Sequence, residues 1–429
     1  MKVFGLHTTH QRFFDLILRF LKILNRYGLF RNRAIPRLEE YIRILRKYQI
    51  VPTLPIPAGV LDRHSHVIEK YSNDGIEFAI HGYQHTDYSM LSEEELLQHL
   101  GNSIALFEKN HVTFSGFKFP YLKFDKKCVD ALSRFPIKWD SSHSIYWNVM
   151  SYLKVENLNR HNFESMLNQY DYKDSSNHVS LPRVYCNLLE IPVSLPDDDL
   201  LERLGVEGNG LAKEIWGGIL AQTYLRGELF SLQLHPERIF LFREALVSTI
   251  EASRQLSPKV WIATMGDIYE WWDEKKKFSV NLNDKGNGEY EVEAKCSPKA
   301  TVLAKLDGSE NSKFYHGFDI VKEHRFSIKS ERRPVIGIPE TSPAELREFL
   351  KNEGFVYELS DNKEQYSLYL DNFREFSEKD ELKALEFINK GDSPLIRFWR
   401  WPSGYKSALA IIGDIDALTS MDFFLRLFG

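Results

Sequence analysis

The sequence predicts an α/β protein whose first 277 residues form a parallel sheet or barrel, followed by a smaller β-rich part. From about residue 36 to residue 275, helical patterns alternate with short apolar runs, which is typical of βα units. After residue 277 the pattern changes to short alternating strands separated by Gly, Asn, Asp and Pro, which indicates a small β-sandwich. The 429 residues, 43% of them hydrophobic, are enough for two or three domains, one of them large.

Helices and strands are predicted to alternate along the first 277 residues. Residues 35–48 are helical in period, and the proline-broken run 50–59 after them predicts a strand. Ser92 is followed three residues later by Glu95, which predicts a capping box and therefore the start of a helix. Further apolar runs predict strands at 75–80, 114–119, 229–234 and 259–265.

The rest of the chain divides into three predicted segments. Residues 278–340 are typical of a small β-sandwich-like domain, and residues 341–395 of a short α/β segment whose helix is capped by Thr341 or Ser342. Residues 396–429 contain a last apolar strand and the start of a helix. The main domain is therefore expected to cover residues 1–277 and to be completed by this last segment.

Composition excludes several classes of protein. A formal net charge of -5 gives no general basic field for nucleic acid. The three cysteines lie far apart without a CxxC pair, so neither a disulfide framework nor a thiolate zinc cluster is indicated. The chain also lacks an apolar run of membrane-spanning length and a secretory leader pattern. We therefore expect a cytoplasmic protein without stable membrane insertion, whose oligomeric state stays open.

Two histidines follow the predicted strand 75–80. His81 and His85 stand four residues apart in the loop between this strand and the next helix. Such a pair also occurs by chance, and a single histidine is more often a hydrogen-bonded structural residue than a ligand. However, the carboxyl ends of parallel strands are where α/β proteins place their ligands, and two neutral imidazoles supply half of a tetrahedral zinc shell.

Two aspartates follow an apolar run near the end of the chain. The stretch "ALAIIGDIDALT" (408–419) reads as a buried strand, and its period of two places Asp414 and Asp416 on the same face. Two carboxylates on one face repel each other unless a cation or a proton lies between them. The alternative is that one aspartate caps a helix or turn, which explains the pair poorly.

Other predicted strands also end in polar residues. His235 follows the run 229–234, while the stretch 116–121 ends another predicted strand and offers Lys118 and Tyr121 beside the stiffening Pro120. Taken singly, such a histidine is often structural and such a lysine is usually solvated. Together, several strands that end in ligand-capable side chains indicate one functional site at the same edge of the sheet.

These motifs resemble those of the polysaccharide deacetylase family, carbohydrate esterase family 4. "HGYQH" (81–85) resembles the family's histidine motif, with Gly82 where Ser or Thr is usual. "KFPY" (118–121) resembles its third motif, with lysine replacing arginine, and "LQLHP" resembles its late leucine-histidine motif. "GDIDA" resembles the aspartate motif of the family's first strand, yet here it comes last. The resemblance implies a distorted (β/α) barrel that is circularly permuted.

The resemblance also implies a metal centre. Asp416, His81 and His85 would bind a divalent metal, with zinc the expected ion. The remaining position would be left to water and to the substrate carbonyl.

The other motif residues would carry out the chemistry. Asp414 would be the general base, and Lys118 would hold it charged and oriented. The backbone N–H of Tyr121 would stabilise the oxyanion, and His235 would be the general acid that protonates the leaving amine.

The function implied by the resemblance is hydrolysis of an N-acetyl or O-acetyl group on an amino sugar or polysaccharide. Two alternatives remain open: a hydrolase of a non-sugar amide, and a catalytically impaired carbohydrate-binding or scaffold protein. Aromatic side chains near the predicted strand ends would either stack on a sugar or pack in the core. These are Tyr88, Tyr121, Trp139, Trp147 and Trp261.

Overall fold

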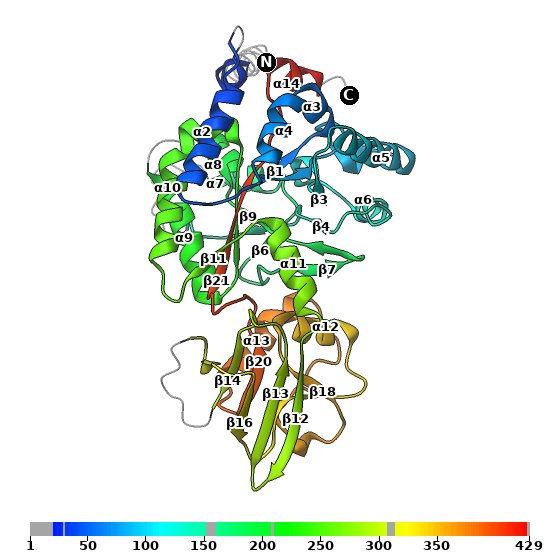
Figure 1. Ribbon diagram of the computed structural model, residues 1–429, viewed down its shortest axis with the longest axis vertical. Helices are drawn as coiled ribbons and strands as arrows, with labels where there is room; N and C mark the ends of the chain where they lie inside the picture. The colour runs from blue at the N-terminus through cyan, green and yellow to red at the C-terminus, as the bar shows by residue number, and fades with distance from the viewer. Residues whose placement is uncertain (1–19, 29–30, 152–159, 207–209, 307–313, 427–429) are drawn as a thin grey trace, which may run out of the picture.

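The computed structural model has an upper part built on a large sheet and a lower β-rich part (Figure 1). The chain leaves the upper part through α11 (Met265–Lys275) and returns to it through β21 (Ser407–Gly413). No helix among the described residues is long and apolar enough to cross a membrane. The structure describes residues 20–28, 31–151, 160–206, 210–306 and 314–426.

Among the described residues, the main sheet contains nine strands, and all of its neighbouring pairs are parallel except β7 and β8. Helices connect most of the parallel strands, so the predicted α/β alternation is confirmed for this part of the chain. The strand order is β10 (Leu229–Leu234), β21, β1 (Thr53–Ile56), β2 (Glu77–Ile80), β3 (Phe114–Phe117), β4 (Trp139–Asp140), β8 (Leu188–Glu190) and β7 (Arg183–Tyr185), with β11 (Val260–Ile262) paired to β21.

The last strand of the chain lies inside this sheet. β21 pairs with β10 from Leu229↔Ala408 to Leu234↔Gly413, and it also pairs with β1 at Thr53↔Ile412. The segment is buried throughout because strands cover both of its edges. Strand order alone does not show how this arrangement arose, so the circular permutation stays a prediction.

The sheet is curled, but it does not close into the predicted barrel. In the described part of the chain, its end strands β10 and β7 do not pair with each other. A second sheet of β5 (Ser144–Tyr146), β6 (Tyr172–Asp174) and β9 (Val193–Leu195) lies beside β10, where the Ser231 N–H donates to Ser194 Oγ at 3.3 Å. The upper part is therefore a mixed α/β fold with a half-barrel sheet.

The helices of the upper part surround this sheet. α5 begins with the predicted capping box, since the Ser92 hydroxyl accepts from the Glu95 N–H and the Glu95 carboxylate accepts from the Ser92 N–H. α9 and α10 pack on each other, and α2 packs on α10. Their bounds are α2 (Ala34–Lys47), α3 (Ala58–Arg63), α4 (Ser65–Asn73), α5 (Glu93–Lys109), α6 (Lys126–Leu132), α7 (Arg160–Leu167), α8 (Asp198–Arg203), α9 (Leu211–Arg226), α10 (Ile239–Gln255) and α14 (Ser420–Leu425).

In its described residues, the lower part consists of three small sheets and two α-helices. Two of the sheets are antiparallel and one is parallel. The sheets are β12 (Ser279–Gly286), β13 (Glu289–Lys295) and β16 (Arg325–Lys329); β15 (Phe318–Val321), β14 (Val302–Lys305) and β20 (Leu395–Phe398); and β18 (Tyr357–Leu359), β17 (Arg333–Ile338) and β19 (Tyr366–Tyr369), with α12 (Ala344–Glu353) and α13 (Glu381–Lys390).

The strand pairings differ from the predicted segments in two places. β17 lies in the predicted β-sandwich segment, but it pairs with β18 and β19 of the α/β segment. β20 lies in the segment expected to complete the main domain, but it pairs with β14 of the lower part. The helix cap is also different, because α12 begins after Pro343 and not at Thr341 or Ser342.

A buried ion cluster joins the two parts. Arg397 and Arg400 are fully buried, and both bind the Glu353 carboxylate, at 3.0 Å and 2.7 Å. Arg400 Nη1 also donates to the carbonyl of Arg226 at the end of α9, at 2.7 Å. One carboxylate on α12 thus compensates two guanidinium groups and connects the lower part to a helix of the upper part.

Replacing Glu353 with alanine should destabilise the protein strongly, because two guanidinium groups would stay buried without a counter-charge. Removing one partner of a buried ion pair typically costs about 3–5 kcal/mol. Urea unfolding followed by circular dichroism should show a lower midpoint. Glu386→Ala, which removes the exposed partner of Lys390, is the control and should leave the midpoint nearly unchanged. Equal midpoints for both variants would contradict the role of Glu353.

Candidate active site

Four strands of the main sheet bring the candidate residues together. The loops after β2, β3, β10 and β21 all start at the carboxyl end of the sheet because these strands are parallel. His81 directly follows β2, Lys118 follows β3, and His235 follows β10. Asp414 and Asp416 lie in the loop just after β21 instead of within the strand. All five side chains are buried.

His81, His85 and Asp416 form a cluster suited to a metal ion. One ligand atom from each residue lies within 4.8 Å of the others. His85 Nε2 is 3.0 Å from Asp416 Oδ1, and His81 Nε2 is 3.8 Å from the same oxygen. This oxygen makes no hydrogen bond of acceptable geometry in the described structure. A buried acceptor facing two imidazoles is the donor set that zinc prefers, so the residues fit this ion.

The tautomer and charge of the cluster also suit metal binding. His81 Nδ1 lies 2.8 Å from the Lys118 carbonyl, so it carries the proton and leaves Nε2 free to bind. Burial, together with repulsion from His85, lowers the pKa of His81 well below its usual range. Burial opposes ionisation of Asp416, but His85, His235 and Arg426 nevertheless hold its pKa well below the usual value. His81 thus favours its neutral form and Asp416 its charged form, as metal ligation requires.

Arg426 contacts the other oxygen of Asp416. Its Nη1 donates to Oδ2 at 3.1 Å from the residue directly after α14. The cap of this helix is Thr419, so the alternative that Asp414 or Asp416 caps a helix is wrong. The guanidinium fixes the carboxylate and leaves one oxygen for a cation. The sequence analysis missed Arg426, because no local pattern links it to the aspartate ten residues earlier.

Asp414 faces Lys118 across a buried ion pair. Lys118 Nζ is 3.6 Å from Asp414 Oδ2, and the same ammonium donates to Gln233 Oε1 at 2.5 Å. Gln233 in turn donates to Asp197 at 2.9 Å. Burial raises the pKa of Asp414 above its usual value, although the charges of Lys118 and His235 oppose this rise. Asp414 is therefore more basic than an exposed aspartate and can accept a proton.

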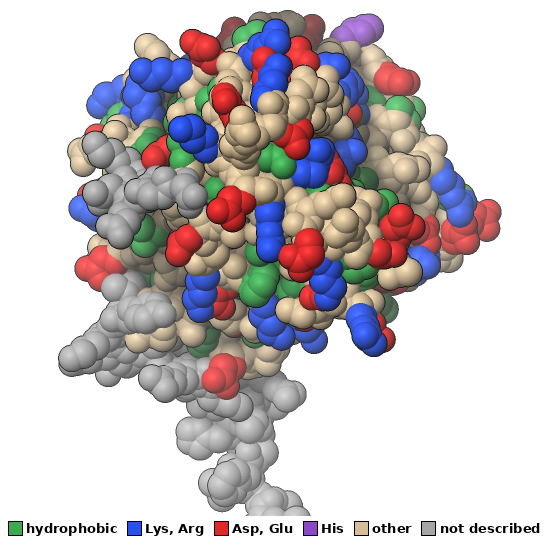
Figure 2. Space-filling view, turned by 90° about the horizontal axis from the view of Figure 1, so that it is seen from below, with side chains coloured by type: hydrophobic (Ala, Val, Ile, Leu, Met, Phe, Trp, Pro, Cys, Tyr) green, Lys and Arg blue, Asp and Glu red, His purple; other side chains and the backbone are tan. Residues whose placement is uncertain are grey.

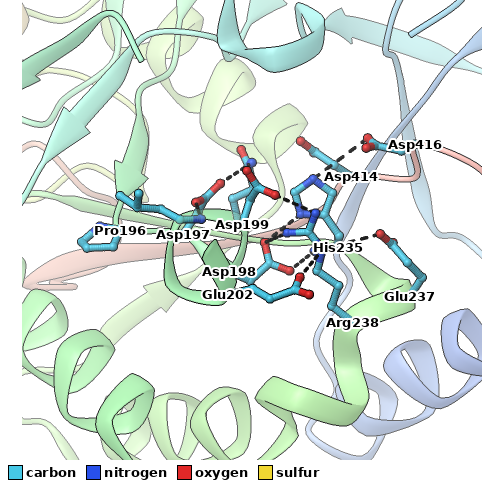
Figure 3. Close-up of polar contacts among 12 residues, drawn as sticks. Pro196, Asp197, Asp198, Asp199, Glu202, His235, Glu237, Arg238, Asp414 and Asp416 are labelled. Atoms are coloured by element: carbon cyan, nitrogen blue, oxygen red, sulfur yellow. Dashed lines mark hydrogen bonds and ion pairs between the residues drawn. The ribbon is translucent and has the colours of Figure 1, made fainter. Parts of the chain in front are cut away.

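His235 is held by Asp198 at the start of α8 (Figure 3). His235 Nδ1 is 2.7 Å from Asp198 Oδ1, and the His235 N–H donates to Oδ2 at 2.7 Å. Burial lowers the pKa of His235, but Asp198 outweighs this effect and raises it to about 10. Its Nε2 faces Asp416 Oδ1 at 4.0 Å. His235 is therefore charged and can donate a proton into the site.

Asp198 is the main functional candidate that the sequence analysis missed. It stands in the acidic run "PDDDL", where local sequence indicates only a helix start. Behind it, Arg238 pairs with Asp199 at 2.7 Å and with Glu202 at 3.2 Å (Figure 3). Its Nη1 also lies 3.9 Å from Asp198 Oδ1, so this guanidinium helps to balance the carboxylate that binds the histidine.

Tyr121 lies at the rim of the site. Its side chain is 44% exposed, and its ring contacts His85 edge to face with centroids 4.4 Å apart. Its backbone has φ 60°, which is uncommon for a residue other than glycine. The loop is anchored two residues earlier, where the Phe119 N–H donates to Ser142 Oγ and this hydroxyl donates to Asp140.

Most of the aromatic candidates for sugar stacking lie in the core. Tyr88, Trp139 and Trp147 are fully buried, so the stacking alternative is wrong for them. Trp261 is partly buried and packs near Trp401. Tyr121 is the exposed member of the predicted set.

The fold and the site define a class of α/β protein. In this class, two histidines and one aspartate at the carboxyl end of the sheet form a cluster that could hold a metal ion. Residues 35–139 match the family model of the polysaccharide deacetylases. The resemblance drawn from the motifs is thereby confirmed, and the match supports a deacetylase-type fold. The matched region includes the histidine motif and "KFPY", whereas His235, Asp414 and Asp416 lie outside it. No curated protein matches the sequence significantly.

Solved structures similar to this chain include three relatives of low sequence identity. A structure from Mycobacterium smegmatis assigned to the polysaccharide deacetylases is 22% identical, covering 56% of this chain and 76% of its own, with a TM-score of 0.40. The allantoinase Puue is 18% identical, with coverages of 56% and 72% and a TM-score of 0.42. A carbohydrate esterase family 4 pseudoenzyme from Bacillus anthracis is 13% identical, with coverages of 40% and 54% and a TM-score of 0.25.

A buried acid pair lies below the Tyr121 loop. Asp140 and Glu190 are register partners on the paired strands β4 and β8, and the Glu190 carboxylate accepts from the N–H groups of Ser142 and His143. Burial raises the pKa of Glu190 to about 7 and, with repulsion from Glu190, raises the pKa of Asp140 well above its usual value. Both acids therefore bind a proton more readily in the folded protein than in the unfolded chain.

Replacing His85 with alanine should abolish stoichiometric zinc binding, because the cluster would keep only two ligands. Metal analysis after dialysis against zinc and a wash should find zinc in the parent protein and little in the variant. His66→Ala removes an exposed histidine on α4 and should retain the parent zinc content. Zinc retained by His85→Ala would contradict the assigned cluster.

The acid pair predicts a dependence of stability on pH. The folded protein binds more protons than the unfolded chain between the unfolded and folded pKa values of Glu190. Stability should therefore fall as the pH rises from about 4.5 to about 7, by up to about 3 kcal/mol. Glu190→Gln should reduce this fall in urea unfolding measured from pH 5 to pH 8. Glu386→Gln, an exposed control, should follow the parent protein. Parallel curves for parent and Glu190→Gln would show that the shift is absent.

Proposed function

We propose that this protein is a metal-dependent hydrolase that removes an acetyl group from an amino sugar or polysaccharide. The observation that supports this most directly is the cluster of His81, His85 and Asp416 beside Asp414 and the His235–Asp198 pair. The family match over residues 35–139 supports the deacetylase class. A carbohydrate substrate is consistent with this class.

Hydrolysis of an amide needs an activated water, a stabilised oxyanion and a proton for the leaving nitrogen. Zinc, when bound, lowers the pKa of water to about 7 and polarises the carbonyl. Asp414 is the proposed general base, since burial makes it more basic and Lys118 holds a compensating charge. His235 is the proposed general acid, since Asp198 keeps it protonated. The backbone N–H of Tyr121 is the proposed oxyanion donor.

We also infer that the chain is a circularly permuted deacetylase with an inserted lower part. This inference is supported by the position of β21 between β10 and β1. In this view the aspartate motif stands at the end of the chain, yet it meets the histidines of β2 in space. The insert would begin after residue 277 and extend through β20, since β20 pairs with β14.

A second candidate function is carbohydrate binding without turnover. It is favoured by Lys118, which offers a point charge where the family's third motif has the planar fork of arginine. Acetate release from N-acetylglucosamine oligomers, measured with and without chelator, separates the two functions. Release that requires metal supports the hydrolase, whereas zinc-containing protein that binds the oligomers without releasing acetate supports the second candidate.

Exchanging the two aspartates singly for asparagine should separate their roles. Asp414→Asn should keep zinc and lose about 10²–10⁴-fold in kcat, because a positioned base contributes roughly that factor. Asp416→Asn should lose both zinc and turnover. Zinc analysis and acetate release on the same samples measure both effects, with Asp273→Asn, an exposed residue of α11, as control. If Asp414→Asn lost zinc as well, the division of roles would be wrong.

A further inference from the structure

A pocket lies at the junction of the upper and lower parts. It has a volume of about 250 Å³ and is lined by α11 from above and by α12 and β18 from below. Figure 1 shows α12 and the end of α11 at this junction, whereas β21 runs away from it toward the candidate active site. The pocket is therefore separate from the metal cluster.

The pocket carries an excess of positive charge. Arg347 and Lys351 stand one helical turn apart on α12, and both line the cavity. In the described part of the chain, neither of them has a carboxylate within ion-pair distance; the Arg347 guanidinium donates instead to the Ser342 carbonyl. Lys276 also lines the cavity but is paired with Asp273 at 3.7 Å. Two unneutralised cations thus face one cavity.

A third basic residue, Lys275, also lines the pocket. Lys275 is buried, and its Nζ donates to the Asn352 carbonyl at 2.7 Å and lies 4.1 Å from the centroid of the Trp272 ring. Burial lowers the pKa of Lys275 to about 7. A negative group bound nearby would therefore favour the charged form of this amine.

Two aromatic residues and one acidic residue also line the pocket. Trp272 and Tyr357 line the cavity and offer apolar ring faces, while Glu348 offers a carboxylate that can accept from hydroxyl groups. The face of the lower part in Figure 2 mixes acidic and basic side chains without a continuous basic field. The excess of positive charge on the described residues of the pocket is therefore a local feature, suited to a small anion.

We propose that this pocket binds the phosphate group of a small ring-bearing molecule, namely a sugar phosphate or a nucleotide. Arg347 and Lys351 would contact the phosphate oxygens through charge-assisted hydrogen bonds. Trp272 and Tyr357 would pack against the ring. Because the lining comes from both parts of the molecule, bound ligand would also strengthen their contact and raise the Tm.

Calorimetric titration of the full chain tests this site. The probes are glucosamine 6-phosphate and uridine monophosphate, with glucosamine and uridine as neutral counterparts. At least one phosphorylated probe should bind saturably, and more tightly than its counterpart. The double variant Arg347→Gln/Lys351→Gln should weaken this binding at least about tenfold, because both phosphate contacts would be lost.

A matched control variant tests whether the loss of affinity is specific to Arg347 and Lys351. Lys322→Gln/Lys329→Gln removes the same charge from exposed positions of the lower part and should change the affinity less than about twofold. His85→Ala should bind the probe as the parent does, so this test does not depend on the proposed hydrolase. The proposal fails if neither phosphate binds up to about 10 mM, if the neutral counterpart binds equally well, or if both double variants weaken binding alike.

Discussion

The candidate site depends on the pairing of β21 with both β10 and β1. This strand stands near the end of the chain, and its ladder with β10 fixes where Asp414 and Asp416 come to lie. Parallel pairing aligns the carboxyl ends of β2, β10 and β21, so the histidines and the aspartates meet at one edge. The ladder is buried on all sides, and a one-residue slip would exchange the faces of its side chains. The register is therefore strongly specified.

The site contains several buried carboxylates, and they stay charged only where basic side chains compensate them. These buried carboxylates have basic partners: Asp198 binds His235, Asp199 binds Arg238, and Asp416 contacts His85 on one oxygen and Arg426 on the other. A buried carboxylate without a partner would take up a proton. The pairings thus decide which oxygen atoms remain available, and Asp416 Oδ1 is among those without a hydrogen bond in the described structure.

Local sequence patterns predicted many of the helices and strands, but not which residues and strands meet in the folded protein. The strands before His81 and His235 and the capping box of α5 are confirmed, because apolar runs and cap residues act over a few positions. Asp198 and Arg426 were missed, since each meets its partner only after folding. For the same reason the sequence did not reveal that β20 pairs with β14, or that the end strands β10 and β7 stay unpaired with each other in the described part of the chain.

The replacement of the family's arginine by Lys118 can be understood from the two aspartates. An arginine fork can bind both oxygens of a carboxylate. Lys118 instead donates to Gln233 and stays 3.6 Å from Asp414 Oδ2, while Asp414 Oδ1 has no hydrogen-bond partner among the described residues. The lysine therefore supplies a compensating charge without occupying both carboxylate oxygens of Asp414. In the proposed mechanism this leaves Asp414 free to take a proton, while Asp416, held by His85 and Arg426, serves the metal. Two aspartates separated by one residue thus acquire different roles from their surroundings alone.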